Sequence, residues 1–343
     1  MKGFLKFFTA LSIVLALLAG AFIWQIEDFL NQPISDKKVP LTISIEAGSS
    51  AAKVAEGLYQ ADYLSHPKWF LWYLKAKKQA NKIKAGEHRI QPEWNVEQLM
   101  NQLVAGKLMQ YPVALIPGET VVQTLKQIQQ QKKLKLELPL EEPAKLQEAF
   151  GIDKPIDERY PYANLEGLFA PETYHYEANE SDLRILQRAR RLQEETLAKA
   201  WTEREEGLPL KTPYEALILA SIVEKESSVK DELPKVAAVF INRMRKGMRL
   251  QTDPTVIYGI GTDYDGDIRS KDLRSKTPYN TYQIDGLPPT PIALPSKAAI
   301  EAVMHPADTK ALYFVADGNG GHVFSNTLKE HNRAVKRYLA TQK

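Results

Sequence analysis

The sequence predicts an α+β protein with three parts: a single N-terminal transmembrane helix, a small α+β domain, and a mainly helical domain with a small β-sheet. Three observations support this fold class. Residues 7–26 contain no charged residue, a strand–turn–helix pattern occurs twice within residues 41–130, and segments with helical spacing dominate from residue 181 onward. Apolar residues at intervals of three to four indicate helices, whereas alternation indicates strands.

Composition narrows the class of protein. The chain has 343 residues, of which 44% are hydrophobic and 25% charged, as in folded proteins of two or more domains. The net charge of +3 is too small to predict a nucleic-acid partner. The absence of cysteine excludes disulfides, thiolate metal sites and a cysteine nucleophile. No paired-histidine motif or phosphate-binding glycine loop occurs, so neither a metal nor a nucleotide cofactor is predicted.

The uncharged N-terminal run predicts where the chain is located. Residues 7–26 are long enough to cross a bilayer core of ~30 Å as a helix. Lysines lie before this run, within residues 1–6, and Glu27 and Asp28 follow it. The positive-inside rule then places residues 1–6 in the cytoplasm and the remainder outside it. We therefore expect a single-pass inner-membrane protein with periplasmic C-terminal domains.

A cleaved signal peptide is the alternative interpretation of the same segment. Ala19-Gly20-Ala21 resembles the small-residue site at which such peptides are cut. The apolar run, however, continues through Phe22-Ile23-Trp24, beyond that site. This length favours an uncleaved anchor.

Residues 27–40 are polar, contain two prolines, and are predicted to be a linker. Residues 41–133 then form the predicted α+β domain, in which the strand–turn–helix pattern repeats when Gly48 is aligned with Gly118. The predicted elements are a strand at 41–45, helices at 51–60, 69–80 and 96–104, a strand within 83–90, a strand at 112–116 and a helix at 121–130. This domain is either a structural spacer or a binding module, since Trp69, Trp72 and Tyr73 suit a core, a sugar-stacking surface or a partner surface.

Residues 134–162, rich in charge and proline, are predicted to connect this domain to a second one at 163–343. Residues 250–295 are dense in turn dipeptides, so we expect loops there. The other predicted elements are helices at 181–202, 233–245, 296–304 and 327–339, and a hairpin of strands 312–315 and 322–324. Gly247 is the expected C-terminal stop of the second of these helices.

A further helix of this domain contains the most informative stretch of the chain. Thr212 is its predicted N-cap and Pro213 its first residue. Residues 216–223 are apolar or small on every side, which indicates a buried helix, and Glu224-Lys225-Glu226 follows. A carboxyl group at the inner end of a buried helix should have a raised pKa and can act as a general acid. We therefore predict Glu224 as the catalytic acid, the alternative being that the charges mark where the helix reaches water.

Several segments together resemble a known family, the endolytic murein transglycosylases (the MltG or YceG-like proteins). The resemblance covers essentially the whole chain, including the anchor. It rests on the following segments: Ser221–Glu226, Phe240-Ile241-Asn242-Arg243, Leu250–Gly259, Tyr279–Pro289 and Leu312–Ala316. It implies a LysM-like domain at 41–133, a catalytic domain at 163–343, and Glu224 as the acid/base.

The resemblance also implies a reaction and partners. The substrate would be peptidoglycan glycan strands, cleaved at the MurNAc–GlcNAc β-1,4 bond to leave 1,6-anhydro-MurNAc ends. One glutamate suffices, because the C6 hydroxyl of the sugar replaces water as the nucleophile. Penicillin-binding proteins and other cell-wall synthesis enzymes are implied partners. Glu226 advances about 200° around the helix from Glu224, so we expect it to lie outside the same cleft.

The two loop segments supply the predicted glycan-binding residues, because amide and hydroxyl groups bond sugar hydroxyls and aromatic faces stack on sugar rings. These residues are Gln251, Thr252, Asp253, Tyr258, Asn280, Thr281 and Tyr282. Two other functions stay open. One is a non-catalytic peptidoglycan-binding scaffold for cell-wall synthases. The other is a conventional hydrolase, which needs a second carboxylate such as Asp253.

Overall fold

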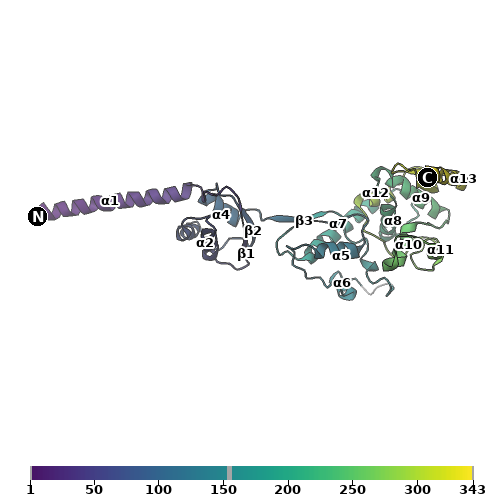
Figure 1. The fold of residues 1–343 in the computed structure, drawn as a ribbon, viewed down its shortest axis with the longest axis horizontal. Coiled ribbons are helices and arrows are strands. Elements are labelled where there is room, and N and C mark those ends of the chain that lie inside the picture. Colours follow the sequence, from purple (N-terminus) through teal and green to yellow (C-terminus); the bar gives the residue numbers. More distant parts are fainter. Residues whose placement is uncertain (1, 153–156, 342–343) are drawn as a thin grey trace. The chain divides into compact units, whose positions relative to one another are not determined.

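The structure is a computed structural model that describes residues 2–152 and 157–341. The predicted fold class is confirmed at a coarse level: the described chain mixes α and β, is mainly helical, contains small two-stranded sheets, and begins with one apolar helix (Figure 1). Its contacts divide it into two compact units. The first runs to Tyr111 and includes Glu177–Asn179, and the second comprises Pro112–Tyr176 and the chain from Glu180 onward.

Helix α1 (Lys2–Asn31) is longer than the predicted span. Thr9–Asn31 is long and apolar enough to cross a membrane, and none of its most apolar stretch is buried against the rest of the described chain. The prediction that residues 27–40 are all linker is wrong at its start, because the helix continues through Glu27 to Asn31. Pro33 explains the end, since the residue before a proline disfavours helical backbone.

The rest of the first unit packs three helices on a two-stranded antiparallel sheet. Strand β1 (Leu41–Ile45) pairs antiparallel with β2 (Gly86–Ile90), with Leu41 opposite Ile90 and Ile45 opposite Gly86. Helices α2 (Ala51–Gln60), α3 (Pro67–Ala76) and α4 (Val96–Val104) cover a core that includes Leu58, Phe70, Leu74, Leu99 and Leu103. Pro67 starts α3 two residues earlier than the periodicity predicted, because proline suits the first helical turn.

The chain enters the second unit within β3 (Gln110–Ala114), which pairs with β4 (Thr173–Glu177). The predicted strand–turn–helix pattern occurs twice, with one copy in each unit. Gly48 and Gly118 both have positive φ, 81° and 77°, and each is followed by a side-chain N-cap, Ser50 for α2 and Thr120 for α5 (Val121–Gln129). The second copy is bound into the second unit, since Gly118 N donates to Leu294 O (2.9 Å) and Leu294 N donates to Glu119 O (2.8 Å). The contacts thus divide the chain near residue 111 and not at the predicted 133.

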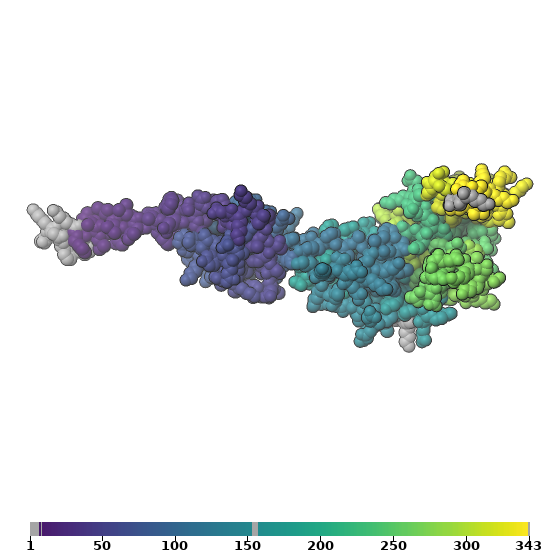
Figure 2. All heavy atoms as spheres, viewed as in Figure 1, coloured from purple at the N-terminus to yellow at the C-terminus, as the bar shows by residue number. Residues whose placement is uncertain are grey.

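The second unit is built around helix α8 (Pro213–Glu226), whose residues 216–223 are all buried. Helices α9 (Leu233–Arg245) and α12 (Lys297–Met304) pack against it. Gly247 follows α9 with φ +64°, as expected for a helix stop. The remaining elements are α6 (Pro143–Ala149), α7 (Asp182–Thr202), α10 (Asp253–Ile260), α11 (Ser270–Arg274), β5 (Tyr313–Ala316), β6 (His322–Ser325), α13 (Leu328–Thr341) and three short 3-10 turns. Helix α13 lies at the surface and is drawn in yellow in Figure 2. Among its described residues, Ala334 is buried.

The sequence missed four of these elements. Helix α6 lies in the predicted connector, β4 opens the second domain, and α10 and α11 lie in the predicted loop region. All four are five to eight residues long. Segments so short contain too few turns for periodicity to identify them.

Candidate active site

Helix α8 presents three charged residues in its last turn. Thr212 caps its start, with its hydroxyl accepting from Glu215 N (3.2 Å), and Pro213 occupies the first turn as predicted. The buried core holds the helix from residue 216 to 223. Ser227 then turns the backbone to an extended conformation (φ −145°, ψ 131°). Glu224, Lys225 and Glu226 therefore leave the core in different directions.

Glu226 lines a cleft of about 360 Å³ in the second unit. Elements far apart in the sequence build its walls: the end of α8, the inner face of α9, the segment that leads into α10, the loop around Tyr282, strand β5 and helix α13. The polar lining side chains are Glu226, Arg243, Gln251, Thr252, Asp253, Tyr282, Tyr313 and His331. The apolar lining residues include Val239, Phe240 and Phe314.

The carboxyl group of Glu226 is suited to donate a proton near neutral pH. Burial raises its pKa to about 6; the nearby charge of Asp253 also raises it, while a hydrogen bond from the Thr252 hydroxyl lowers it. The end of α8 adds the negative pole of the helix dipole, which likewise disfavours a carboxylate. The sequence predicted a raised pKa for Glu224 and made no such prediction for Glu226.

Buried threonines fix the backbone of Thr252, whose hydroxyl donates to Glu226. Thr252 N donates to Thr281 Oγ1 (3.0 Å), and the hydroxyls of Thr255 and Thr281 are 2.8 Å apart. All three threonines are buried. Gln251, which precedes this network, has φ +50°, a conformation that costs free energy in a residue with a side chain and that recurs at functional sites.

Arg243 is a cleft residue that the sequence reasoning did not propose as functional. Its guanidinium donates to Leu250 O (2.6 Å) and to Gln251 Oε1 (3.1 Å) and lies 5.2 Å from the centre of the Tyr313 ring. Burial lowers its pKa. The sequence feature that could have identified Arg243 is its position in the segment Phe240–Arg243, on a helix whose other residues are mostly apolar.

His331 and Tyr313 were also missed. Their rings stack with centroids 5.2 Å apart. Burial, and secondarily the charge of Arg243, lowers the pKa of His331. His331 Nδ1 is buried and has no hydrogen-bond partner among the described residues. Such an unsatisfied polar atom in a cleft is a candidate for contact with a ligand.

The predicted glycan-binding residues divide into two groups. Gln251, Thr252, Asp253 and Tyr282 line the cleft, and Tyr282 Oη donates to Asp253 Oδ1 (2.7 Å). The polar groups of the other three bond within the protein. Thr281 belongs to the threonine network, and Asn280 donates to three carbonyls between residues 272 and 275. Tyr258 Oη donates to Glu166 Oε1 (3.4 Å). The structure thus brings four of the seven to the cleft.

Glu224, the predicted catalytic residue, lies at a different place. It accepts from the backbone N–H and the hydroxyl of Ser296, which is the N-cap of α12. Next to it, Lys225 Nζ donates to Gly118 O (3.0 Å). Glu224 therefore joins the end of α8 to the start of α12. The expectation that Glu226 does not share a cleft with Glu224 agrees with the structure, because Glu226 lines the cleft whereas Glu224 bonds to Ser296. The residue that lies with four of the predicted binding residues is Glu226 and not Glu224.

Glu166 is a second buried carboxyl group that the sequence did not reveal. It is 1% exposed, accepts from Val121 N (2.9 Å) at the start of α5, and contacts Tyr258 Oη. Burial raises its pKa to about 8. In the part of the chain that the structure describes, no group of three or more histidine, aspartate or glutamate side chains is arranged to hold a metal ion.

Comparison with known proteins places the chain in a family. Residues 43–337 match the YceG-like family, so the chain belongs to it. The chain is 31% identical over 340 residues to the endolytic murein transglycosylase of Bacillus subtilis, covering 95% of this chain and 92% of the relative. It is 28% identical to the enzyme of the same name from Streptococcus pneumoniae strain D39, of which it spans 64%.

A solved structure agrees with this assignment. A crystal structure of a yceG-like protein from Listeria monocytogenes is 29% identical, with a TM-score of 0.53, and covers 87% of this chain and 99% of that one. The predicted family is therefore confirmed. The predicted enzyme class is confirmed through the relatives, which are named endolytic murein transglycosylases.

Proposed function

We propose that this protein is a membrane-anchored endolytic lytic transglycosylase that cleaves the MurNAc–GlcNAc β-1,4 bond of peptidoglycan glycan strands and leaves 1,6-anhydro-MurNAc ends. The observation that carries the proposal is the protonatable carboxyl group of Glu226 in a cleft lined by amide, hydroxyl and aromatic groups. Membership of the YceG-like family supports the substrate class.

In this mechanism Glu226 acts first as acid and then as base. Its proton passes to the glycosidic oxygen as the C1–O bond breaks. The resulting carboxylate then removes the proton from the C6 hydroxyl, whose oxygen bonds to C1 and closes the anhydro ring. The proton returns to Glu226, so no water is consumed. The Thr252 hydroxyl holds the carboxyl group in place.

Glu224 was predicted for this role, and that assignment stays a prediction. Its hydrogen bonds to the N-cap of α12 favour a positioning role instead. Asp253, Tyr282, Gln251 and Arg243 are the proposed glycan contacts. Penicillin-binding proteins as partners also remain a prediction.

One observation favours a second candidate function, a conventional hydrolase. Asp253 lines the same cleft as Glu226 and raises its pKa through its charge, so two carboxylates are present, as a hydrolase requires. Digestion of peptidoglycan in ¹⁸O-labelled water distinguishes the two. The transglycosylase gives anhydro ends without label. Label at C1 of the muramic acid would contradict it and indicate the hydrolase.

The anchor is part of the proposal. Helix α1 supports a single span with residues 1–6 in the cytoplasm and the chain that follows α1 in the periplasm. Protease added to spheroplasts should then digest the C-terminal unit, and the N-terminal residues should be present in the mature protein. A mature chain that begins near Phe22 would identify the segment as a cleaved signal.

A further inference from the structure

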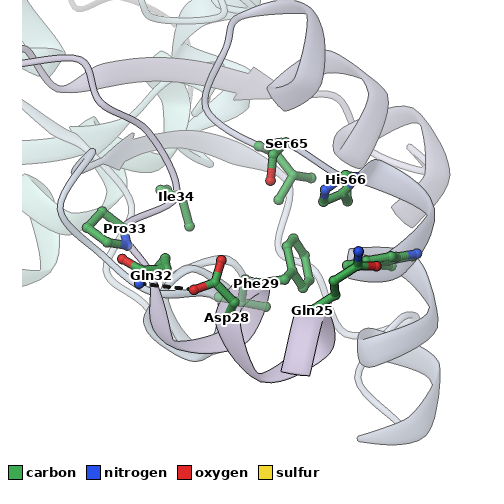
Figure 3. A pocket seen from close by; sticks show the side chains of 11 residues that line it. Gln25, Asp28, Phe29, Gln32, Pro33, Ile34, Ser65 and His66 are labelled. Carbon is green, nitrogen blue, oxygen red and sulfur yellow. Dashed lines mark hydrogen bonds between the residues drawn. The ribbon is translucent and has the colours of Figure 1, made fainter. Parts of the chain in front are cut away.

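Aromatic contacts join helix α1 to the start of α3 within the first unit. The ring of Phe22 meets Trp69 edge-on with centroids 6.2 Å apart, and Phe29 meets Trp69 at 5.5 Å and His66 at 5.8 Å. Figure 3 shows Phe29 and His66 at this junction, beside a pocket that the last turns of α1 line with Gln25 and Asp28. These contacts fix α3 relative to the end of α1.

This junction sets the depth of α3 relative to a bilayer. Phe22 lies inside the proposed span, four residues before its expected end at Ile26. At 1.5 Å per helical residue, that is about 6 Å below the end of the span. Trp69, in contact with Phe22, therefore lies at the level where lipid headgroups meet acyl chains. Tryptophan is enriched at this level because its ring is apolar and its N–H is polar.

The exposed face of α3 has the composition of a membrane-surface helix. Trp72 lies one turn after Trp69 on the same face and is 66% exposed. Two exposed lysines, Lys68 and Lys75, lie on the same face of α3 as Trp72. Two more exposed lysines, Lys77 and Lys78, follow directly after the helix, and Lys77 Nζ lies 5.6 Å from the centre of the Tyr73 ring. None of the four is in an ion pair with a described residue. Ammonium groups beside an interfacial tryptophan suit lipid phosphates.

We propose that α3 lies on the outer face of the membrane that α1 spans, with Trp72 among the lipid headgroups and the lysines beside their phosphates. The occupant of this surface is the bilayer itself, because Trp69 already packs on a residue inside the span. The first unit is thereby held at the membrane surface. The inference rests on the proposed anchor and is independent of the catalytic assignment.

The absence of cysteine allows a direct test, because single cysteines can be introduced into the full-length chain and spin-labelled. The variants are W72C, K75C, W24C and L136C, each reconstituted in vesicles of phosphatidylethanolamine and phosphatidylglycerol. K75C retains Trp72, W24C reports on the span, and Leu136, which is 52% exposed in the second unit, reports on water. Collision rates with oxygen and with a water-soluble nickel chelate give the depth of each label.

The expected result is a label at 24 in lipid, labels at 72 and 75 several-fold less accessible to the chelate than the label at 136, and full accessibility at 136. Labels at 72 and 75 as accessible as the one at 136, with 24 in lipid, would overturn the inference and leave the anchor intact. A water-exposed label at 24 would overturn the anchor, and with it this inference.

Discussion

Glu224 and Glu226 lie two residues apart at the end of α8, yet they occupy unlike surroundings. Glu226 lines the cleft, contacts Thr252, and has a pKa raised by burial. Glu224 accepts two hydrogen bonds from Ser296 and joins two helices. A helix buried on every side offers two interior directions at its end. What the rest of the chain brings to each direction decides which carboxyl group can do chemistry.

The largest effect that distinguishes them is expected from E226Q. Glutamine keeps the shape and a hydrogen-bond acceptor for Thr252 but cannot donate the proton. We expect the rate of glycan cleavage to fall by at least about 10²–10⁴. The rate is measured as anhydro ends released from purified peptidoglycan.

The matched control is E224Q, which leaves the cleft intact. We expect it to retain most of the activity per folded molecule. Loss of activity in E224Q with near wild-type rates in E226Q would reverse the assignment and restore Glu224 as the acid.

The next effect concerns stability. E224A leaves the Ser296 N–H and hydroxyl without their acceptor at the start of α12. An unsatisfied donor costs about 1–3 kcal/mol when it is buried, and the pair of Glu224 and Ser296 is partly buried. We expect the free energy of unfolding, measured by denaturant titration, to decrease by an amount near the lower end of that range while E226Q remains close to wild type. An unchanged stability of E224A would remove the structural role given to this glutamate.

Several features of the end of α8 and of the cleft could be predicted from the sequence. The capped, all-apolar helix and the charges at its end predicted a raised pKa, which was assigned to Glu224 and occurs at Glu226. The segment around Gln251–Asp253 predicted part of the cleft. The sequence could not determine which of Glu224 and Glu226 lines the cleft, because a helix without a polar face gives no indication of which side meets the cleft. Arg243, Tyr313 and His331 were missed because α9, β5 and α13 converge only in three dimensions.

The fold shows the same limit. The strand–turn–helix repeat and the longer helices followed from periodicity and caps. The second copy of the repeat, however, belongs to the second unit because Gly118 and Glu119 bond to Leu294, some 175 residues away along the chain. Such long-range pairing has no signature in local spacing.

Glu166 is expected to make the free energy of unfolding depend on pH in a way that an exposed carboxylate does not. Its folded-state pKa of about 8 is above the value near 4.5 of an exposed glutamate, so the folded chain binds the proton more tightly than the unfolded chain. Its contribution therefore makes stability decrease as pH rises from about 4.5 to about 8. We expect E166Q to remove this component from the unfolding free energy measured across that range. An identical pH slope in E166Q and wild type would show that Glu166 does not titrate there.

The smallest effects are expected from substitutions of Thr252 and Asp253, which displace the pH dependence of activity in opposite directions. T252V removes a hydrogen bond that lowers the pKa of Glu226, so activity should persist to higher pH. D253N removes a charge that raises this pKa, so activity should be lost at lower pH. We expect opposite displacements of the alkaline limb of the pH–rate profile, each of about one pH unit or less. Displacement in the same direction would show that the limb does not report on Glu226.

The central claim is that the carboxyl group of Glu226 supplies the proton for cleavage. Its titration can be followed by ¹³C NMR of the full-length protein labelled at glutamate Cδ, with the resonance assigned by its disappearance in E226Q. The predicted result is a midpoint near pH 6 that coincides with the pH at which wild-type cleavage activity is lost. A Glu226 that titrates near 4.3, the value for an unperturbed glutamate, while activity persists to neutral pH, would contradict the claim.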